Sequence, residues 1–171
     1  MFNIDLVDYS VRPLSREDGE ALRQMFEACE DYFLVVEGQA PPPGAAIEAF
    51  DAMPPGRSIE DKFIFGIFDV RAHLVGVLEG MRQYPDETTW WIGLLLLAPN
   101  ARNRGLGEII IRRFKSYVQR NGGRAIALGV VADNERALGF WRKLGFMVVR
   151  QTEPRRFGNK TQTIRVLQRI L

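Results

Sequence analysis

The stretch TWWIGLLLLAP, from Thr89 to Pro99, is apolar on both of its alternating sets of positions. A half-exposed strand alternates apolar and polar residues, whereas a strand covered on both faces is a continuous apolar run. The stretch is also far shorter than the ~20 apolar residues that a bilayer-spanning helix needs. It therefore predicts a central strand in the sheet of a water-soluble protein.

The rest of the chain shows helical and strand-like periodicities in a mixed order. We expect strands at 9–13, 62–70, 73–82, 88–97 and 125–131, a closing hairpin of 146–151 with 161–170 around a basic loop, and helices after Ser15 and at 45–53, 105–121 and 134–144. Ser15 and Asp18 form a variant of the capping box at the first helix. The 171 residues are 46% hydrophobic, which suits one core. We predict an α/β fold with a mixed sheet in a single domain, residues 1–171.

Two residue types exclude whole classes of site. Cys29 is the single cysteine and His73 the single histidine, so neither an internal disulfide nor a Cys/His zinc cluster can form, and we expect no metal. The N-terminus MFNIDLVDYS lacks the basic start and long apolar run of a secretory leader. We therefore expect a cytoplasmic protein with no membrane segment.

The net charge of +2 conceals an asymmetry between two parts of the chain. Residues 1–101 carry 7 Lys+Arg against 17 Asp+Glu, and residues 102–171 carry 16 against 4, which gives −10 and +12. One interpretation is that the basic part holds a polyanion and the acidic part receives a cation; the alternative is that both charges solvate surfaces. A nucleic-acid partner is not expected, because the basic segments lack interleaved stacking aromatics and a recognition-helix signature.

A basic turn with two glycines, Arg102 to Gly107, connects the central strand to an amphipathic helix. A helix N-terminus presents unpaired amides, Gly105 and Gly107 allow close backbone approach, and Arg102 and Arg104 add forked donors for phosphate oxygens. The P-loop pattern fails because no Lys-Ser/Thr pair follows, and the dinucleotide pattern fails because Ile110 replaces its third glycine. The turn predicts a diphosphate site, and the alternative is an ordinary strand-to-helix turn.

Two motifs resemble those of a known family. Arg102, Gly105 and Gly107 match the Q/R-x-x-G-x-G/A motif of the GNAT superfamily, the acyl-coenzyme A dependent N-acetyltransferases, and NERALGFWRKLGF, 134–146, is similar to its second signature. The resemblance covers roughly residues 62–151. It implies a mixed sheet of about seven strands, splayed in the middle and flanked by about four helices.

The resemblance assigns roles to residues around the turn. It implies that acetyl-coenzyme A is the co-substrate and that its diphosphate is held by the segment Arg102, Asn103, Arg104, Gly105, Leu106 and Gly107. The backbone of Leu97 would pair with the pantetheine arm, and the amide of Leu95 would donate to the thioester oxygen. Asn134 would bond the pantetheine and Lys143 a phosphate, although an N-cap and a solvated helix residue are equally compatible. Phe140 and Trp141 would form a wall beside the coenzyme or fill the core.

One position departs from the family pattern. Many members have a tyrosine at the position of Trp141, where it protonates the departing thiolate. Indole donates only through a nitrogen that does not ionise usefully, so Trp141 cannot be that acid. A thiolate with a pKa near ~8.5 leaves without help, so the change slows the reaction without forbidding it.

The acceptor amine must lose a proton before it attacks, because an alkylammonium with a pKa near ~10.4 is protonated at neutral pH. The central strand offers no carboxylate. The candidates for the base are therefore Glu79, Asp86 and Glu87, with Tyr84 as a bridging group, and we favour Glu79 because a regular strand fixes its direction. Its alternative role is pairing with a nearby arginine. Asp31 and Tyr32, at the end of the first helix, are candidates to line the amine side, as are Asp86 and Glu87.

The resemblance thus implies an N-acetyltransferase that moves acetyl to a primary amine of a small cationic metabolite, an antibiotic or a protein by direct attack in a ternary complex. The alternative is a non-catalytic acyl-coenzyme A binding module, favoured by Trp141 and by the lack of a carboxylate on the central strand. A homodimer is left open.

Overall fold

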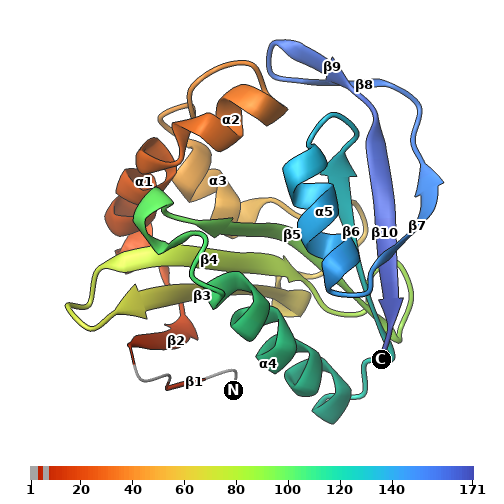
Figure 1. Ribbon diagram of the computed structural model, residues 1–171, viewed down its shortest axis with the longest axis horizontal. Coiled ribbons are helices and arrows are strands. Elements are labelled where there is room, and N and C mark those ends of the chain that lie inside the picture. Colours follow the sequence, from red (N-terminus) through yellow and green to blue (C-terminus); the bar gives the residue numbers. More distant parts are fainter. Residues whose placement is uncertain (1–3, 6–7) are drawn as a thin grey trace.

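The computed structural model describes residues 4–5 and 8–171 and forms a twisted sheet with helices on both faces (Figure 1). The helices are α1 (Gly19–Ala28), α2 (Glu30–Val36), α3 (Ala45–Asp51), α4 (Leu106–Arg120) and α5 (Glu135–Lys143). The strands are β1 (Ile4–Asp5), β2 (Tyr9–Pro13), β3 (Lys62–Asp69), β4 (Leu74–Met81), β5 (Thr89–Leu97), β6 (Ala125–Val131), β7 (Met147–Gln151), β8 (Arg155–Phe157), β9 (Lys160–Gln162) and β10 (Ile164–Ile170). The predicted mixed α/β class is confirmed.

The main sheet has the order β1-β2-β3-β4-β5-β6-β10-β7 among the described strands, and β8 and β9 form a separate hairpin. All neighbours are antiparallel except β5 and β6, which are joined through α4. The predicted central strand is β5, which lies between β4 and β6. The eight strands agree with the expected seven apart from β1, which is two residues long.

Two apolar clusters cover the two faces of the sheet. One contains the inner sides of α4 and α5, with Phe114 and Leu138 fully buried against strand residues such as Leu128. The other cluster joins α1, α2 and α3 to the opposite face of the sheet and includes Phe26 of α1 and Leu96 of β5. These two layers explain why β5 is apolar at alternating positions on both sides.

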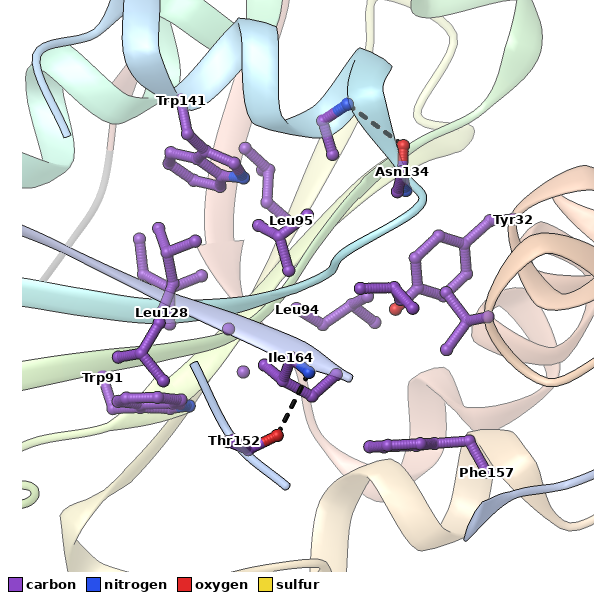
Figure 2. A pocket seen from close by; sticks show the side chains of 18 of the residues that line it. Tyr32, Trp91, Leu94, Leu95, Leu128, Asn134, Trp141, Thr152, Phe157 and Ile164 are labelled. Carbon is purple, nitrogen blue, oxygen red and sulfur yellow. Dashed lines mark hydrogen bonds between the residues drawn. The ribbon is translucent and has the colours of Figure 1, made fainter. Parts of the chain in front are cut away.

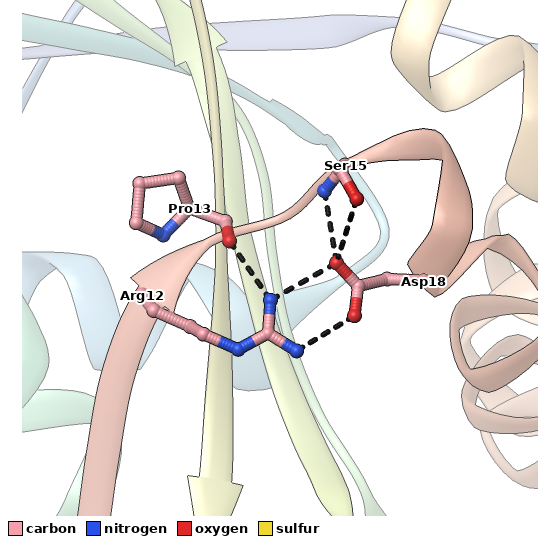
Figure 3. Close-up of polar contacts among 4 residues, drawn as sticks. All are labelled: Arg12, Pro13, Ser15 and Asp18. Atoms are coloured by element: carbon pink, nitrogen blue, oxygen red, sulfur yellow. Dashed lines mark hydrogen bonds and ion pairs between the residues drawn. The ribbon is translucent and has the colours of Figure 1, made fainter.

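The start of the first helical segment follows the predicted capping box (Figure 3). The amide of Ser15 donates to Oδ2 of Asp18 at 2.9 Å, and the guanidinium of Arg12 donates to both carboxylate oxygens, at 2.7 and 3.0 Å. The ion pair lowers the pKa of Asp18, because Arg12 stabilises the charged carboxylate. The segment therefore begins at a carboxylate that is held from both sides.

Two expectations about elements were incomplete. The described residues contain five α-helices where about four were expected, because the first helix ends at Ala28 and a new one begins at Glu30. Cys29 leaves the helical conformation at φ −104° and ψ 27°, and its amide closes α1 on the carbonyls of Met25 and Phe26. The basic loop inside the closing hairpin is itself a β-hairpin, β8 with β9, since Gly158 adopts the positive φ of 52° that its turn requires.

Candidate active site

The two parallel strands at the centre of the sheet separate along their length. Their pairing runs from Thr89↔Ala125 to Ile92↔Leu128, whereas β5 continues to Leu97 and β6 to Val131. The carboxyl ends of both strands therefore diverge beyond Ile92. This is the splay that the resemblance implied.

Backbone groups of β5 face this opening. The amide of Ala98 donates to the carbonyl of Val75 at 2.8 Å, on the β4 side. The backbone N–H and C=O groups of successive residues in a strand point to opposite sides. Those of Leu96 therefore also point to β4, while those of Leu95 and Leu97 point away from β4 and towards β6. The Leu97 carbonyl agrees with this direction, since it accepts from Nε of Arg102 at 2.7 Å.

A cavity of about 420 Å³ lies in the opening (Figure 2). Its walls come from β5, β6, the start of α5, the end of α2 and the closing strands, and Tyr32 enters from the α2 side with its ring directed towards Leu94. Two glycines, Gly93 on β5 and Gly129 on β6, are exposed in its lining. Backbone that is bare in this way admits a substrate close to both strands.

The predicted coenzyme turn has the backbone of an anion-binding loop. Asn103 and Gly105 adopt left-handed φ values of 61° and 77°, and α4 begins at Leu106. Alternation of left- and right-handed residues turns successive amides to one side, where they form a concave anion site next to the helix N-terminus. A Cβ on Gly105 would meet nothing within 4 Å, so the turn is open to a ligand, and Arg104 beside it is exposed. The residues fit the diphosphate of a coenzyme.

Arg102 is engaged in a different direction. Besides the Leu97 carbonyl, it donates to both carboxylate oxygens of Asp31 on α2. Its side chain is 15% exposed, and the ion pair lowers the pKa of Asp31. Arg102 thus fixes the end of β5 to α2, and Asp31 is occupied by this contact and is not among the residues that line the cavity.

Gly107 lies where α4 packs closely against α5. A Cβ at this position would lie 3.3 Å from Cζ of Phe140 and 3.6 Å from Cδ1 of Leu97. The side chain of Leu106 is 2% exposed in the core, so only its amide is available to the turn. The glycine therefore lets the first turn of α4 press against α5.

Helix α5 links the turn to the cavity. On one flank Nη2 of Arg136 donates to Oδ1 of Asn103 at 3.3 Å, and Nζ of Lys143 pairs with Glu108 at 3.2 Å. On the other flank Asn134 and Trp141 line the cavity. Asn134 is the N-cap of α5, where its Oδ1 accepts from the amide of Ala137 at 3.1 Å.

Trp141 is 6% exposed and packs edge-to-face with Phe140 and Phe146, both at 5.0 Å between ring centroids. Phe140 is half-buried and packs against the same core. The indole therefore combines both expected roles, because it fills core space and also forms part of the cavity wall.

Glu79 lies on β4, opposite Leu94 and next to a β-bulge at Gly93. Oε1 accepts from Nζ of Lys62 at 2.5 Å, and Oε2 lies 2.6 Å from where a Cβ on Gly93 would be. The glycine at the bulge leaves room for this carboxylate in its present position. Burial raises the pKa of Glu79, with Lys62 opposing the rise. The alternative role, an ion pair with a basic side chain, is present, but the partner is Lys62 and not an arginine.

The other candidates for the amine side are distributed unevenly. Tyr32 and Tyr84 line the cavity, and burial together with the charges of Glu37 and Glu79 raises the pKa of Tyr32 to about 12. Tyr84 lies edge-to-face on Trp91 at 5.7 Å and beneath the guanidinium of Arg57 at 5.5 Å.

The carboxylate of Asp86 is used within its own loop, where it accepts from the amides and hydroxyls of Thr88 and Thr89. These bonds lower its pKa. Glu87, next to it, is exposed, and neither residue is among those that line the cavity.

Sequence reasoning missed Lys62, Gly93 and two cavity arginines, Arg150 and Arg155. Lys62 and Gly93 become visible only once the β4 register and bulge are known. Arg155 lay in a segment interpreted as a loop, so the direction of its side chain had no basis in the sequence.

Residues 4–5 and 8–171 contain no group of His, Cys, Asp and Glu suited to a metal ion. Within the same part of the chain, no helix is long and apolar enough to cross a membrane.

Comparison with known proteins identifies the family. Residues 20–146 match the model of the Acetyltransferase (GNAT) family. No curated protein matches the chain.

Several solved structures share the fold. An acetyltransferase from Thermus thermophilus is 22% identical with a TM-score of 0.76, and covers 98% of this chain and 100% of its own. A putative phosphinothricin N-acetyltransferase is 15% identical with a TM-score of 0.72, over 95% and 98%. Spermidine N-acetyltransferase from Vibrio cholerae, in complex with CoA and spermine, is 15% identical with a TM-score of 0.67, over 96% of both chains. With the splayed strands, the coenzyme turn and the family match together, the chain belongs to the GNAT acetyltransferase family.

Proposed function

We propose that this protein transfers acetyl from acetyl-coenzyme A to a primary amine by direct attack in a ternary complex. The observation that carries the proposal is the position of the cavity, which lies where β5 and β6 diverge and is joined through α5 to the turn at Asn103–Gly107. The diphosphate would bind the turn amides, and the pantetheine arm would add to the polar edge of β5 at Leu95 and Leu97.

The proposed chemistry has one bond formed and one broken. The amine nitrogen attacks the thioester carbonyl carbon, the C–S bond breaks, the nitrogen loses a proton and the sulfur gains one. The amide of Leu95 faces the opening and would donate to the carbonyl oxygen as negative charge develops on it. Such a donor acts where the transition state differs most from the substrate.

We assign the general base to Glu79. Its carboxylate lies against Gly93, which is exposed in the cavity, so a water or the amine itself can reach it across the bare backbone. A raised pKa matches a base that must accept a proton and release it again near neutral pH. Lys62 would act as a positioning residue that holds the carboxylate ionised and directed.

Thiol release from acetyl-coenzyme A, measured across amino acids, polyamines, aminoglycosides and peptides, tests the proposal. Gly105→Asp is expected to abolish turnover by placing an anion at the diphosphate site, and its control is Gly122→Asp at the other end of α4, where φ is 82° and the space is equally open. Glu79→Gln is expected to lower kcat by about 10²-fold or more, the usual contribution of a general base. Its control is Glu17→Gln, an exposed carboxylate far along the chain from β4.

Trp141 favours a second candidate, a non-catalytic acyl-coenzyme A binding module, because indole cannot protonate the leaving thiolate. Tight coenzyme binding with no thiol release on any amine would support the module and refute the transferase. Turnover of one amine class that is lost in Gly105→Asp would do the reverse.

A further inference from the structure

The charged side chains in the cavity lining have one sign. Arg150 and Arg155 are the charged side chains in its lining, and no carboxylate is among the described residues that form it. Tyr32, Asn134 and Thr152 add neutral polar groups. Two arginines in the lining favour an anionic group of the acceptor on their side of the cavity.

Arg150 is placed on the cavity face by strand register. On β7 it lies directly opposite Val166 of β10, and Val166 in turn lies opposite Gly129 of β6. Residues directly opposite one another project to the same face, so the three form one row across the sheet. Arg150 is therefore about 10 Å, or two strand spacings, from the bare backbone of Gly129, within reach of a small ligand bound there.

Arg155 is held on an anchored element. Its guanidinium lies 4.8 Å from the ring centroid of Phe157, which also lines the cavity. The β8–β9 hairpin that carries both is tied to the end of α2: Nε2 of Gln162 donates to the carbonyls of Val35 and Val36, both at 3.0 Å. The hairpin thus forms one side of the cavity and holds Arg155 in place on that side.

Three carboxylates near the cavity are committed to other partners, and Glu37, whose charge acts on Tyr32, lies outside the lining. Asp31 is paired with Arg102, Glu79 with Lys62, and Asp86 with its own loop. Within the described part of the chain, neither Arg150 nor Arg155 has an ion pair. The acidic excess of residues 1–101 therefore contributes no carboxylate to the cavity lining.

From this charge pattern we propose that the acceptor is a small primary amine that also carries a carboxylate, as an amino acid does, and that Arg150 and Arg155 bind this carboxylate. The inference rests on the proposed transferase function and specifies its substrate class. A guanidinium is suited to it, because its forked donors match the two oxygens of a carboxylate. The amine end would then lie towards Gly93 and Glu79, across the cavity from β7 and β8.

The test compares matched pairs of acceptors that differ in the carboxylate alone: L-phenylalanine with phenethylamine, L-leucine with 3-methylbutylamine, and L-lysine with cadaverine. We expect the acid of each reactive pair to have a kcat/KM at least about tenfold higher, as the loss of one charge-assisted contact predicts. Arg150→Ala and Arg155→Ala should each raise KM for the acid by about tenfold and leave the decarboxylated amine unchanged. Arg156→Ala, on the same hairpin but outside the lining, is the control.

Preference for the decarboxylated partner, or an equal loss on both partners in the arginine variants, would overturn the inference while the transferase function stands. If no amine is turned over, the transferase function itself fails. Calorimetric binding then still decides the inference: N-acetyl-L-phenylalanine should bind the wild type more tightly than N-acetylphenethylamine, and Arg155→Ala should remove the difference. Equal binding of the two would refute a carboxylate site.

Discussion

Replacing Lys62 and Glu79 singly and together shows whether their ion pair stabilises the fold or is retained for catalysis. The Lys62 side chain is 4% exposed and that of Glu79 17%, with 2.5 Å between Nζ and Oε1. Removing one partner of such a buried pair costs about 3–5 kcal/mol, because the other charge loses its compensation, whereas replacing both with apolar residues is often neutral or stabilising. We expect Lys62→Met to lower the free energy of unfolding by at least about 3 kcal/mol. The Ala52 carbonyl also loses its donor in this variant, which adds to the loss.

The double variant Lys62→Met with Glu79→Leu should recover to within about 1 kcal/mol of the wild type, since the desolvation of two charges is removed along with their attraction. Its thiol-release activity should stay about 10²-fold or more below the wild type, because the base is gone. Urea denaturation measures the free energy of unfolding, and acetyl transfer to the preferred amine measures activity. A double variant no more stable than Lys62→Met would refute the reasoning, since the pair would then serve the fold.

The same pair predicts a pH dependence of stability. Burial raises the pKa of Glu79, so the folded protein holds this proton more tightly than the unfolded chain does. The resulting stabilisation is complete below the ordinary carboxyl pKa of about 4.3 and is lost as pH rises through the higher folded value. The difference in unfolding free energy between the wild type and the double variant should therefore shift in favour of the double variant as pH rises. Activity should fall as pH drops below the folded pKa of Glu79. If activity instead falls only at the ordinary carboxyl pKa, Glu79 is not the base.

Three further changes test single features. Gly105 and Gly122 have φ values of 77° and 82° with open space around each, so replacing either with Ala should destabilise the fold by about 1–2 kcal/mol. Only Gly105→Ala should weaken coenzyme binding in calorimetry. Equal coenzyme affinities of the two variants would show that the turn is not part of the site. Trp141→Tyr should raise kcat about tenfold or more by supplying an acid to the thiolate, and an unchanged kcat in a folded variant would show that protonation is not limiting. Gln162→Ala should cost about 1–3 kcal/mol in urea denaturation, because the Val36 carbonyl loses its side-chain donor and the Val35 carbonyl keeps only Lys160. A loss below about 0.5 kcal/mol, the range of neutral surface changes, would show that water replaces the amide.

Local features could be predicted from the sequence because neighbours along the chain determine them. The capping box at Ser15 and Asp18, the glycine turn that leads into α4 and the N-cap at Asn134 depend on residues within one helical turn. The apolar run at β5 predicted a central strand for a similar reason, since burial on both faces leaves a direct mark on residue type. With the second signature at 134–146, these features sufficed to identify the family.

Only the tertiary structure decided which distant residues share the active site. The contacts of Arg102 with Asp31, 71 residues away, and with the carbonyl at the end of β5 had no signal in the local sequence. One extra residue at the Gly93 bulge sets where Glu79 lies, and the register of β7 on β10 brings Arg150 to the cavity. A strand that slips by one residue reverses every side chain, and the sequence does not encode that register locally. The turn and the central strand were therefore fixed by sequence, while the charge of the acceptor cavity was set by how the strands pair.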